Sequence, residues 1–176
     1  MLTGVLLAGV AALWLMPHSS QRENAPVSAA PQLPELYIDR PRWTLFDQQG
    51  RPSRQLQARR LEQWAGEEAA RLTQPRLNIN DRQQRHWLID AKTGWIYPDE
   101  RPFLLEQEVT VQQEPANNGL LLQTAQLRID HNTDTIDTEA PVVLRTGSWH
   151  FTSMGMRANL GRQQLELLTQ VRGIHE

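Results

Sequence analysis

Side chains that could carry catalysis or hold a metal are few and scattered in this chain of 176 residues. There are no cysteines, which excludes thiolate zinc sites, cysteine nucleophiles and disulfides. The histidines show no metal-binding spacing; they are His18, His86, His131, His150 and His175. The sequence also lacks a Gly-x-Ser-x-Gly elbow and a phosphate-binding glycine loop. These observations argue against an enzyme and predict no cofactor.

Acidic residues come close together at three places. Asp130, His131 and Asp134 could form a metal corner, but the stretch reads more simply as a polar turn. The carboxylate pairs at 67–68 and 99–100 lie in turn-like stretches, where solvated charge is the simpler interpretation. The net charge is −2, so the chain has no excess of positive charge to attract phosphate backbones, and no nucleic-acid partner is expected.

Tryptophan is frequent, with six in the chain. Trp14 lies in an N-terminal apolar run, and the others lie on or beside stretches that read as strands. The others are Trp43, Trp64, Trp87, Trp95 and Trp149. Large aromatic residues commonly pack in cores or at strand edges. The alternative is an apolar interior that holds acyl chains. The sequence favours packing and leaves the alternative open.

The first sixteen residues, MLTGVLLAGVAALWLM, contain no charged side chain. This run is short for a membrane span of ~20 residues. A signal peptide is the alternative, but the nearest small-residue cleavage site, at 27–29, lies too far beyond Met16. We therefore expect residues 1–16 to form an uncleaved transmembrane anchor. Residues 17–35, rich in Pro, Ser and Ala, are expected to form a flexible linker.

From Tyr37 onward apolar and polar residues alternate with a period of two, which predicts half-buried β-strands. The alternation is clearest at 77–80, 109–112 and 125–130. Turn-forming residues separate such stretches at 49–50, 81–85, 117–119 and 146–147. Residues 58–72 and 162–170 could instead form helices, but an internal repeat favours strand for both.

The repeat is marked by four alanines at spacings of 33, 34 and 33 residues: Ala58, Ala91, Ala125 and Ala158. About half a repeat after each alanine, a second strand begins near a Gln or Glu. These residues are Gln74, Gln107, Glu139 and Gln170. The aligned segments are LTQPRLNI, LEQEVTVQ, TEAPVVLR and LTQVRGIH. The repeat predicts stacked antiparallel strands that pair with their neighbours, and it makes the C-terminal segment the fourth copy of an internal strand.

Three stretches carry a resemblance to a known family. They are WTLFDQQGRPSRQLQARRLEQW with LTQPRLNINDRQQRHWLIDAKTG, the Leu-Arg-Thr-Gly turn at 144–147, and GMRANLGRQQLELLTQVRGIHE. From Tyr37 to Glu176 the chain resembles the LptC family, bitopic inner-membrane components of the lipopolysaccharide export machine. The resemblance implies an all-β fold, an antiparallel twisted half-jellyroll of the OstA/LptA type with a V-shaped apolar trough. It also implies one N-terminal transmembrane helix, with residues 36–176 as a periplasmic domain.

The resemblance further implies transport without catalysis. The family is tethered to the LptB/LptF/LptG ABC transporter, accepts lipopolysaccharide from the inner membrane, and passes it to LptA in a bridge towards the outer membrane. Burial of each methylene of a lipid A acyl chain is worth ~0.8 kcal/mol, which explains the need for an apolar trough. The alternative is a membrane-tethered adaptor that regulates the transporter without binding lipid. A periplasmic hydrolase is disfavoured.

Site residues follow from the resemblance together with strand alternation. The residues expected to bind lipid in the trough are Leu72, Leu77, Ile79, Trp87, Ile89, Val109, Val111, Leu127, Ile129, Trp149 and Phe151. The residues expected to contact LptA are Leu165, Leu167, Val171 and His175. His175 stands where the family has an aromatic residue. Gly147 matches a family glycine at which a large residue would disturb transporter assembly, although a turn that needs positive φ explains it equally well.

Overall fold

The computed structural model describes residues 33–80, 85–99, 101–114, 119–130, 132–159, 162 and 164–175. The chain divides into two units, residues 1–32 and 33–176, and the description below concerns the second. The anchor expected at 1–16, most of the linker expected at 17–35, and most of the turns expected at 81–85 and 117–119 lie outside the described residues. Within the described ranges, no helix is long and apolar enough to cross a membrane.

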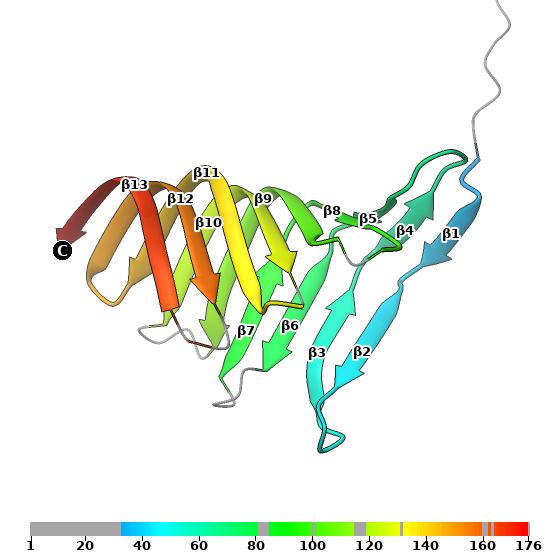
Figure 1. Ribbon diagram of the computed structural model, residues 1–176, viewed down its shortest axis with the longest axis horizontal. Coiled ribbons are helices and arrows are strands. Elements are labelled where there is room, and N and C mark those ends of the chain that lie inside the picture. Colours follow the sequence, from blue (N-terminus) through cyan, green and yellow to red (C-terminus); the bar gives the residue numbers. More distant parts are fainter. Residues whose placement is uncertain are drawn as a thin grey trace, which may run out of the picture. The chain divides into compact units, whose positions relative to one another are not determined.

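Thirteen β-strands, all paired antiparallel, make up the described part of the chain (Figure 1). They are β1 (Leu36–Asp39), β2 (Arg42–Phe46), β3 (Pro52–Gln57), β4 (Arg60–Gln63), β5 (Ala70–Thr73), β6 (Arg76–Asn80), β7 (His86–Asp90), β8 (Thr93–Ile96), β9 (Phe103–Glu114), β10 (Leu120–Asp130), β11 (Thr135–Thr146), β12 (Trp149–Asn159) and β13 (Gln164–His175). The described residues of 58–72 and 162–170 contain strands and turns and no helix, so the choice of strand there is confirmed.

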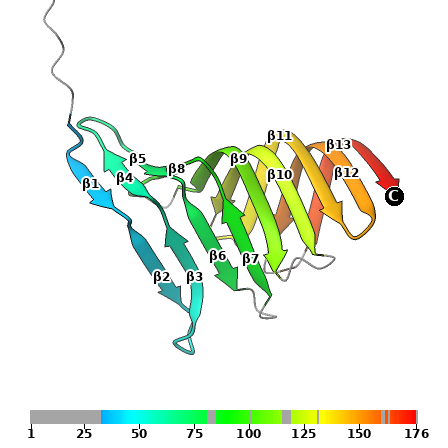
Figure 2. The same cartoon turned by 180° about the vertical axis from the view of Figure 1, so that it is seen from behind.

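One sheet contains all of these strands, and it branches at β9. The beginning of β9 pairs with β8, at Leu104 and Trp95, and its end pairs with β7, at Val111 and Ile89. We call the branch with β1, β4, β5 and β8 the first arm, and the branch with β2, β3, β6 and β7 the second arm. The long strands β9–β13 run through both arms, and Figure 2 shows the two sets of short strands diverging from them.

The sequence repeat marks the places where the strands bend between the arms. Gln74, Gln107 and Gln170 have positive φ values of 51°, 64° and 51°. Ala58 lies between β3 and β4, and Ala91 lies between β7 and β8. Their N–H groups donate to the carbonyls of residues 41 and 75 on the neighbouring stretches of chain, both at 3.2 Å. A bulge or a left-handed residue is the usual way for a strand to change direction, which explains why the pattern recurs.

The fourth alanine does not occupy the equivalent place, so that prediction is wrong. In β12 the bend lies near Gly155, which has a φ of 77°, and Ala158 lies further along, paired with Ile136 and Leu165. A Cβ atom at Gly155 would lie 2.9 Å from the Leu168 side chain and 3.2 Å from a backbone oxygen of β11. The bend of β12 therefore requires glycine rather than alanine.

An apolar core lies between the inner faces of the two arms. Its buried members are Leu77, Ile79, Ile89, Leu105, Val109, Val111, Leu122, Leu127, Ile129, Ile136, Val142, Leu144 and Met156. In β10 the buried positions Leu122 and Thr124 are two apart, whereas the next, Leu127, follows after three. A register shift between Thr124 and Gln126 accounts for the extra residue. The bulge thus returns the apolar residues to the inner face after the bend.

Candidate functional site

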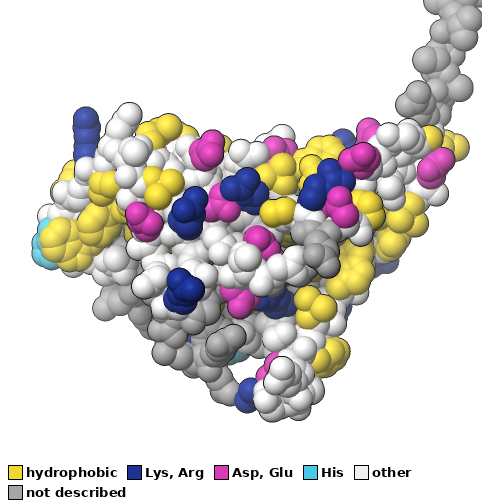
Figure 3. Space-filling model, in the orientation of Figure 1, with side chains coloured by type: hydrophobic (Ala, Val, Ile, Leu, Met, Phe, Trp, Pro, Cys, Tyr) yellow, Lys and Arg dark blue, Asp and Glu magenta, His cyan; other side chains and the backbone are white. Residues whose placement is uncertain are grey.

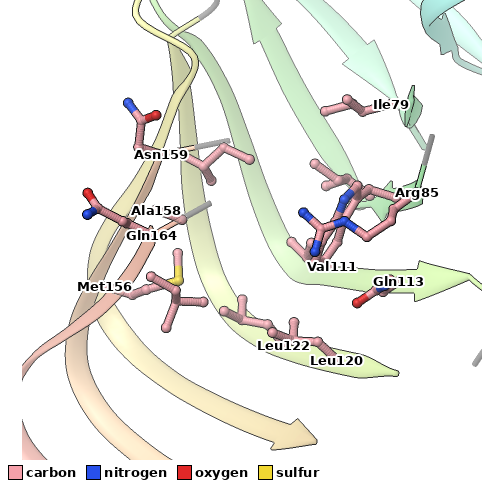
Figure 4. Close-up of a pocket in the computed structure, with 14 residues that line it drawn as sticks. Ile79, Arg85, Val111, Gln113, Leu120, Leu122, Met156, Ala158, Asn159 and Gln164 are labelled. Atoms are coloured by element: carbon pink, nitrogen blue, oxygen red, sulfur yellow. The ribbon is translucent and has the colours of Figure 1, made fainter. Parts of the chain in front are cut away.

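An apolar pocket of about 220 Å3 lies between the inner faces of the arms (Figure 4). Strands β6, β7, β9 and β10 supply one wall, and β11, β12 and β13 supply the other. The lining residues are Ile79, Arg85, Trp87, Ile89, Val111, Gln113, Leu120, Leu122, Ile136, Met156, Ala158, Asn159, Gln164 and Leu165. In Figure 4, Met156 and Ala158 lie on one wall and Val111 on the opposite one. We call this space the trough.

Strand alternation explains why these walls are apolar. Trp87 and Ile89 are two residues apart on β7, and Leu120 and Leu122 are two apart on β10, so each pair presents both side chains to one face. The polar atoms of Arg85, Gln113, Asn159 and Gln164 are the exceptions, and these residues lie at or next to strand ends. The trough is therefore apolar along its walls and polar near the strand tips.

The residues expected to line the trough are found in several environments. Four of them, Ile79, Trp87, Ile89 and Val111, line the pocket. Another four are buried in the same core without lining the pocket: Leu77, Val109, Leu127 and Ile129. Alternation identified the apolar face, and the position along each strand decides which of these side chains reach the space between the arms.

The remaining three expected lining residues lie away from the pocket. Leu72 has no exposed surface and packs with Ala58 and Leu61 in a second, smaller cluster of the first arm. Trp149 is 47% exposed, and Phe151 is half-buried against the main core. Trp149 and Phe151 lie on β12 beside the C-terminal edge of the sheet, where they form part of an aromatic group.

This aromatic group consists of Trp149, Phe151 and His175. The Trp149 and Phe151 rings are stacked, with centroids 5.7 Å apart and an interplanar angle of 11°. The His175 ring meets Trp149 edge-on, with centroids 4.8 Å apart and an angle of 74°. Register explains the contact, because Trp149 lies directly opposite His175 in the β12–β13 pair. The group therefore fixes the C-terminal end of β13 to its neighbour.

Strand β13 forms a free edge, since it pairs with β12 and with no other described strand. Leu165, Leu168, Val171 and Ile174 on this strand are 40%, 40%, 50% and 65% exposed. Figure 3 shows hydrophobic side chains gathered at the end of the sheet that carries β13. A long edge strand with apolar side chains is a template for pairing with another chain.

The residues expected at the LptA contact all lie on β13 but have different surroundings. Leu165 lines the trough, and Leu167 packs against the main core. Val171 is exposed and lies at the register shift between β12 and β13. His175 contacts Trp149. Because Leu165 belongs both to the trough wall and to the free edge, the trough reaches that edge.

Gly147 occupies the turn between β11 and β12. Its φ is 55°, and a Cβ atom there would have nothing within 4 Å. The local backbone therefore accounts for glycine without any close contact.

Several trough residues were missed by the sequence interpretation. Leu120 and Leu122 extend the alternation of β10 upstream of Thr124, and a longer pattern search would have found them. Met156 gave no such signal, because the bend at Gly155 resets the alternation of β12.

The interpretation of 130–134 as a polar turn is confirmed for Asp130, whose carboxylate accepts the backbone N–H of Asn132 at 2.9 Å and of Thr133 at 3.3 Å. His131 lies outside the described residues. Asp134 forms an ion pair with Arg54. Among the described residues, no group of three His, Asp or Glu side chains is placed to hold a metal.

Several charged side chains on the outer faces form exposed pairs, and Figure 3 shows the two signs interspersed on one face. Arg128 and Asp137 lie opposite each other on β10 and β11, and the hydrogen bond and charge of Asp137 raise the pKa of Arg128. Arg76 donates to Asp90 at 2.7 Å, which likewise raises the pKa of Arg76. Exposed pairs of this kind each contribute ~0–1 kcal/mol to the free energy of unfolding. The charges on the outer faces therefore contribute to solubility more than to stability.

A family model described as "LptC: Lipopolysaccharide-assembly, LptC-related" matches residues 2–176. No curated protein matches the chain significantly. Among solved structures, the chain is similar to LptH from Pseudomonas aeruginosa, described as the LptA homologous periplasmic component of the lipopolysaccharide transport device. The TM-score is 0.55 and the identity 8%, with 70% of this chain and 94% of that chain covered. At this identity the likeness shows the fold, an all-β antiparallel open sheet of the LptA type.

Proposed function

Because the chain belongs to the LptC-related lipopolysaccharide-assembly family, whose members take part in lipopolysaccharide transport rather than catalysis, we propose that it is a lipid conduit of the cell envelope. In this proposal residues 1–16 anchor the chain once in the inner membrane, residues 17–35 form a linker, and residues 36–176 form the periplasmic domain. The domain accepts lipopolysaccharide that the LptB/LptF/LptG transporter extracts, holds its acyl chains in the trough, and passes it to LptA.

The observation that carries the proposal is that the apolar trough reaches the free edge of β13 through Leu165. A lipid sheltered between the arms can therefore reach that edge. If a strand of LptA pairs with β13, the two troughs become continuous. The apolar walls supply the driving force, since each buried methylene is worth ~0.8 kcal/mol.

The edge joint is energetically reasonable. Strand β13 has 12 residues, and added strands form backbone hydrogen bonds worth ~0.5–1.5 kcal/mol each. Exposed apolar side chains of β13 such as Val171 and Ile174 add buried area. These gains offset the ~4–15 kcal/mol cost of association, so a specific complex needs no large interface.

The opposite edge fits the transporter side of the proposal. There, Trp43, Leu45 and Phe46 of β2 are 38%, 59% and 61% exposed, and Tyr37 of β1 is 52% exposed. The family resemblance places the transporter contact towards this end of the domain. Gly147 would act in assembly through its turn, since a larger residue would strain the backbone there.

Photocrosslinking tests whether lipid enters the trough. A photoreactive residue at Leu120 points into the trough, whereas one at Gln123 on the same strand is exposed on the outer face. We expect lipopolysaccharide adducts at Leu120 and none at Gln123 while the transporter hydrolyses ATP. Absence of adducts at Leu120 during active export would refute the conduit and favour an adaptor that regulates the transporter without binding lipid.

A further inference from the structure

An ion pair joins the two arms of the sheet. Arg54 lies on β3 in the second arm, and Asp134 lies in the turn between β10 and β11 at the tip of the first arm. The guanidinium of Arg54 donates to Oδ1 of Asp134, although the residues are 80 positions apart in the sequence. The side chains are 25% and 33% exposed, so both charges are partly removed from water.

Arg54 faces the trough. It lies two residues before Leu56, which packs against the apolar core, and successive side chains of a strand alternate between faces. In the β3–β6 pair Arg54 lies opposite Ile79, which lines the pocket. Its guanidinium is therefore a cation at the border of an apolar space.

The turn that carries Asp134 is held in place. Asp130 accepts two backbone N–H groups of the turn, and the Asn159 side chain donates to the carbonyl of Thr133 at 3.3 Å. Ile136 follows the turn on β11, and Asn159 contacts the turn from β12. Both residues line the trough. Asp134 is thus presented at the border of the trough by a fixed loop.

A large amphiphile cannot enter the trough in this arrangement. Pockets that bury drug-sized ligands measure ~300–1,000 Å3, whereas the trough measures about 220 Å3. Several acyl chains therefore require the arms to separate, and separation breaks the Arg54–Asp134 pair. A partly buried guanidinium that loses its carboxylate carries a desolvation penalty unless another anion replaces it. Phosphate is the anion best matched to the planar donors of arginine.

We propose that Arg54 is a phosphate-binding residue for the lipid, exchanging the Asp134 carboxylate for a phosphate of a phosphorylated amphiphile as the arms open. Asp134 holds Arg54 in place while the trough is empty and competes with the phosphate. This inference rests on the proposed function, because it requires lipid between the arms. Arg85, which lies 5.7 Å over the Trp87 ring and lines the trough, adds a second cation on the same arm.

The test compares binding of lipid A and of dephosphorylated lipid A to the full-length chain. We expect the unmodified protein to bind the phosphorylated form about tenfold more tightly, as one charge-assisted hydrogen-bonded contact allows. Arg54→Gln should abolish this preference, and Asp134→Asn should keep it. The control Arg128→Gln breaks an arginine–aspartate pair on the outer face and should change neither affinity.

The charge exchange Arg54→Asp with Asp134→Arg tests whether the ion pair holds the arms together. Because the chain has no cysteine, spin labels at Gln49→Cys and Asn132→Cys report the distance between the arms without background. We expect the exchange to restore the short distance that Arg54→Gln loses.

Three results would overturn the inference. Persistence of the preference in Arg54→Gln would show that the pair only closes the arms. Equal binding of both lipids by the unmodified protein would remove the role of Arg54 and leave the trough proposal intact. Binding of neither lipid would overturn the conduit itself together with this inference.

Discussion

The ring of Phe151 lies against the backbone of Gly173, its partner on β13, so that a Cβ atom at Gly173 would lie 2.8 Å from Cε1 of the ring. Glycine weakens most strands, and its replacement by alanine usually stabilises by ~0.4–1 kcal/mol. Here the added methyl group displaces the ring and its stacking on Trp149. We therefore predict that Gly173→Ala lowers the free energy of unfolding, by about 1 kcal/mol.

Urea unfolding of a double-mutant cycle checks this explanation. In the background of Phe151→Leu, the same alanine should cost little or become favourable, since the obstructing ring is gone. Stabilisation by Gly173→Ala in the otherwise unmodified protein would show that the ring moves aside freely.

Leu72 provides a second prediction. The sequence placed it on the lipid path, but the side chain is fully buried beside Ala58 and Leu61. Leu72→Ala should therefore cost ~2–5 kcal/mol of stability, the usual range for a buried leucine. Leu165→Ala, at a position 40% exposed in the trough wall, should cost less than about 1 kcal/mol. Comparable urea midpoints for the two variants would contradict this assignment.

A charged residue on β13 should block the pairing of another strand with this free edge. Ile174 is 65% exposed, so Ile174→Lys should leave the domain folded while the lysine opposes strand addition. We predict that the affinity for LptA falls at least about tenfold, corresponding to ~1.4 kcal/mol. Leu45→Lys, an exposed position at the opposite edge, is the matched control and should not change LptA binding. An unchanged affinity for Ile174→Lys would exclude this edge as the joint.

Asp47 makes the β2–β3 turn sensitive to acid. The backbone N–H of Arg51 is the main cause that lowers the pKa of this carboxyl from its ordinary value of 3.8, aided by the Arg51 guanidinium and the Gln49 N–H. The pKa of Asp47 is lower in the folded state than in the unfolded state. The stability that Asp47 contributes is therefore complete above pH 3.8 and is lost as the pH falls through the lowered pKa of the folded state. An NMR titration of the carboxyl should give a midpoint below 3.8, and a midpoint at or above it would refute the assignment.

Much of the fold was readable from local patterns. Alternation predicted the strands, and the repeat located bends at Ala58, Ala91 and Gln107 because each bend needs a bulge or a left-handed residue. The branching of the sheet at β9 was not readable, since pairing with two strands at once leaves no local signature. Gly155 broke the repeat because the approach of Leu168 leaves no room for alanine.

The candidate site was less predictable than the fold. Alternation identifies a face, but which residues of that face reach the trough depends on where the arms come together. For this reason Ile79 lines the trough, whereas Leu77, two residues earlier on the same strand, is core. The Arg54–Asp134 pair joins segments 80 residues apart, and no spacing in the sequence relates them.

In the proposed function, lipid passes through the trough on its way to LptA. The most direct measurement uses vesicles containing the transporter and this chain, with a photoreactive residue at Leu122 in the trough wall and soluble LptA outside. After ATP is added, we predict lipopolysaccharide adducts at Leu122 before lipid appears on LptA, and accumulation at Leu122 when Ile174→Lys blocks the edge. Arrival of lipid on LptA with no adduct at Leu122 would contradict passage through the trough.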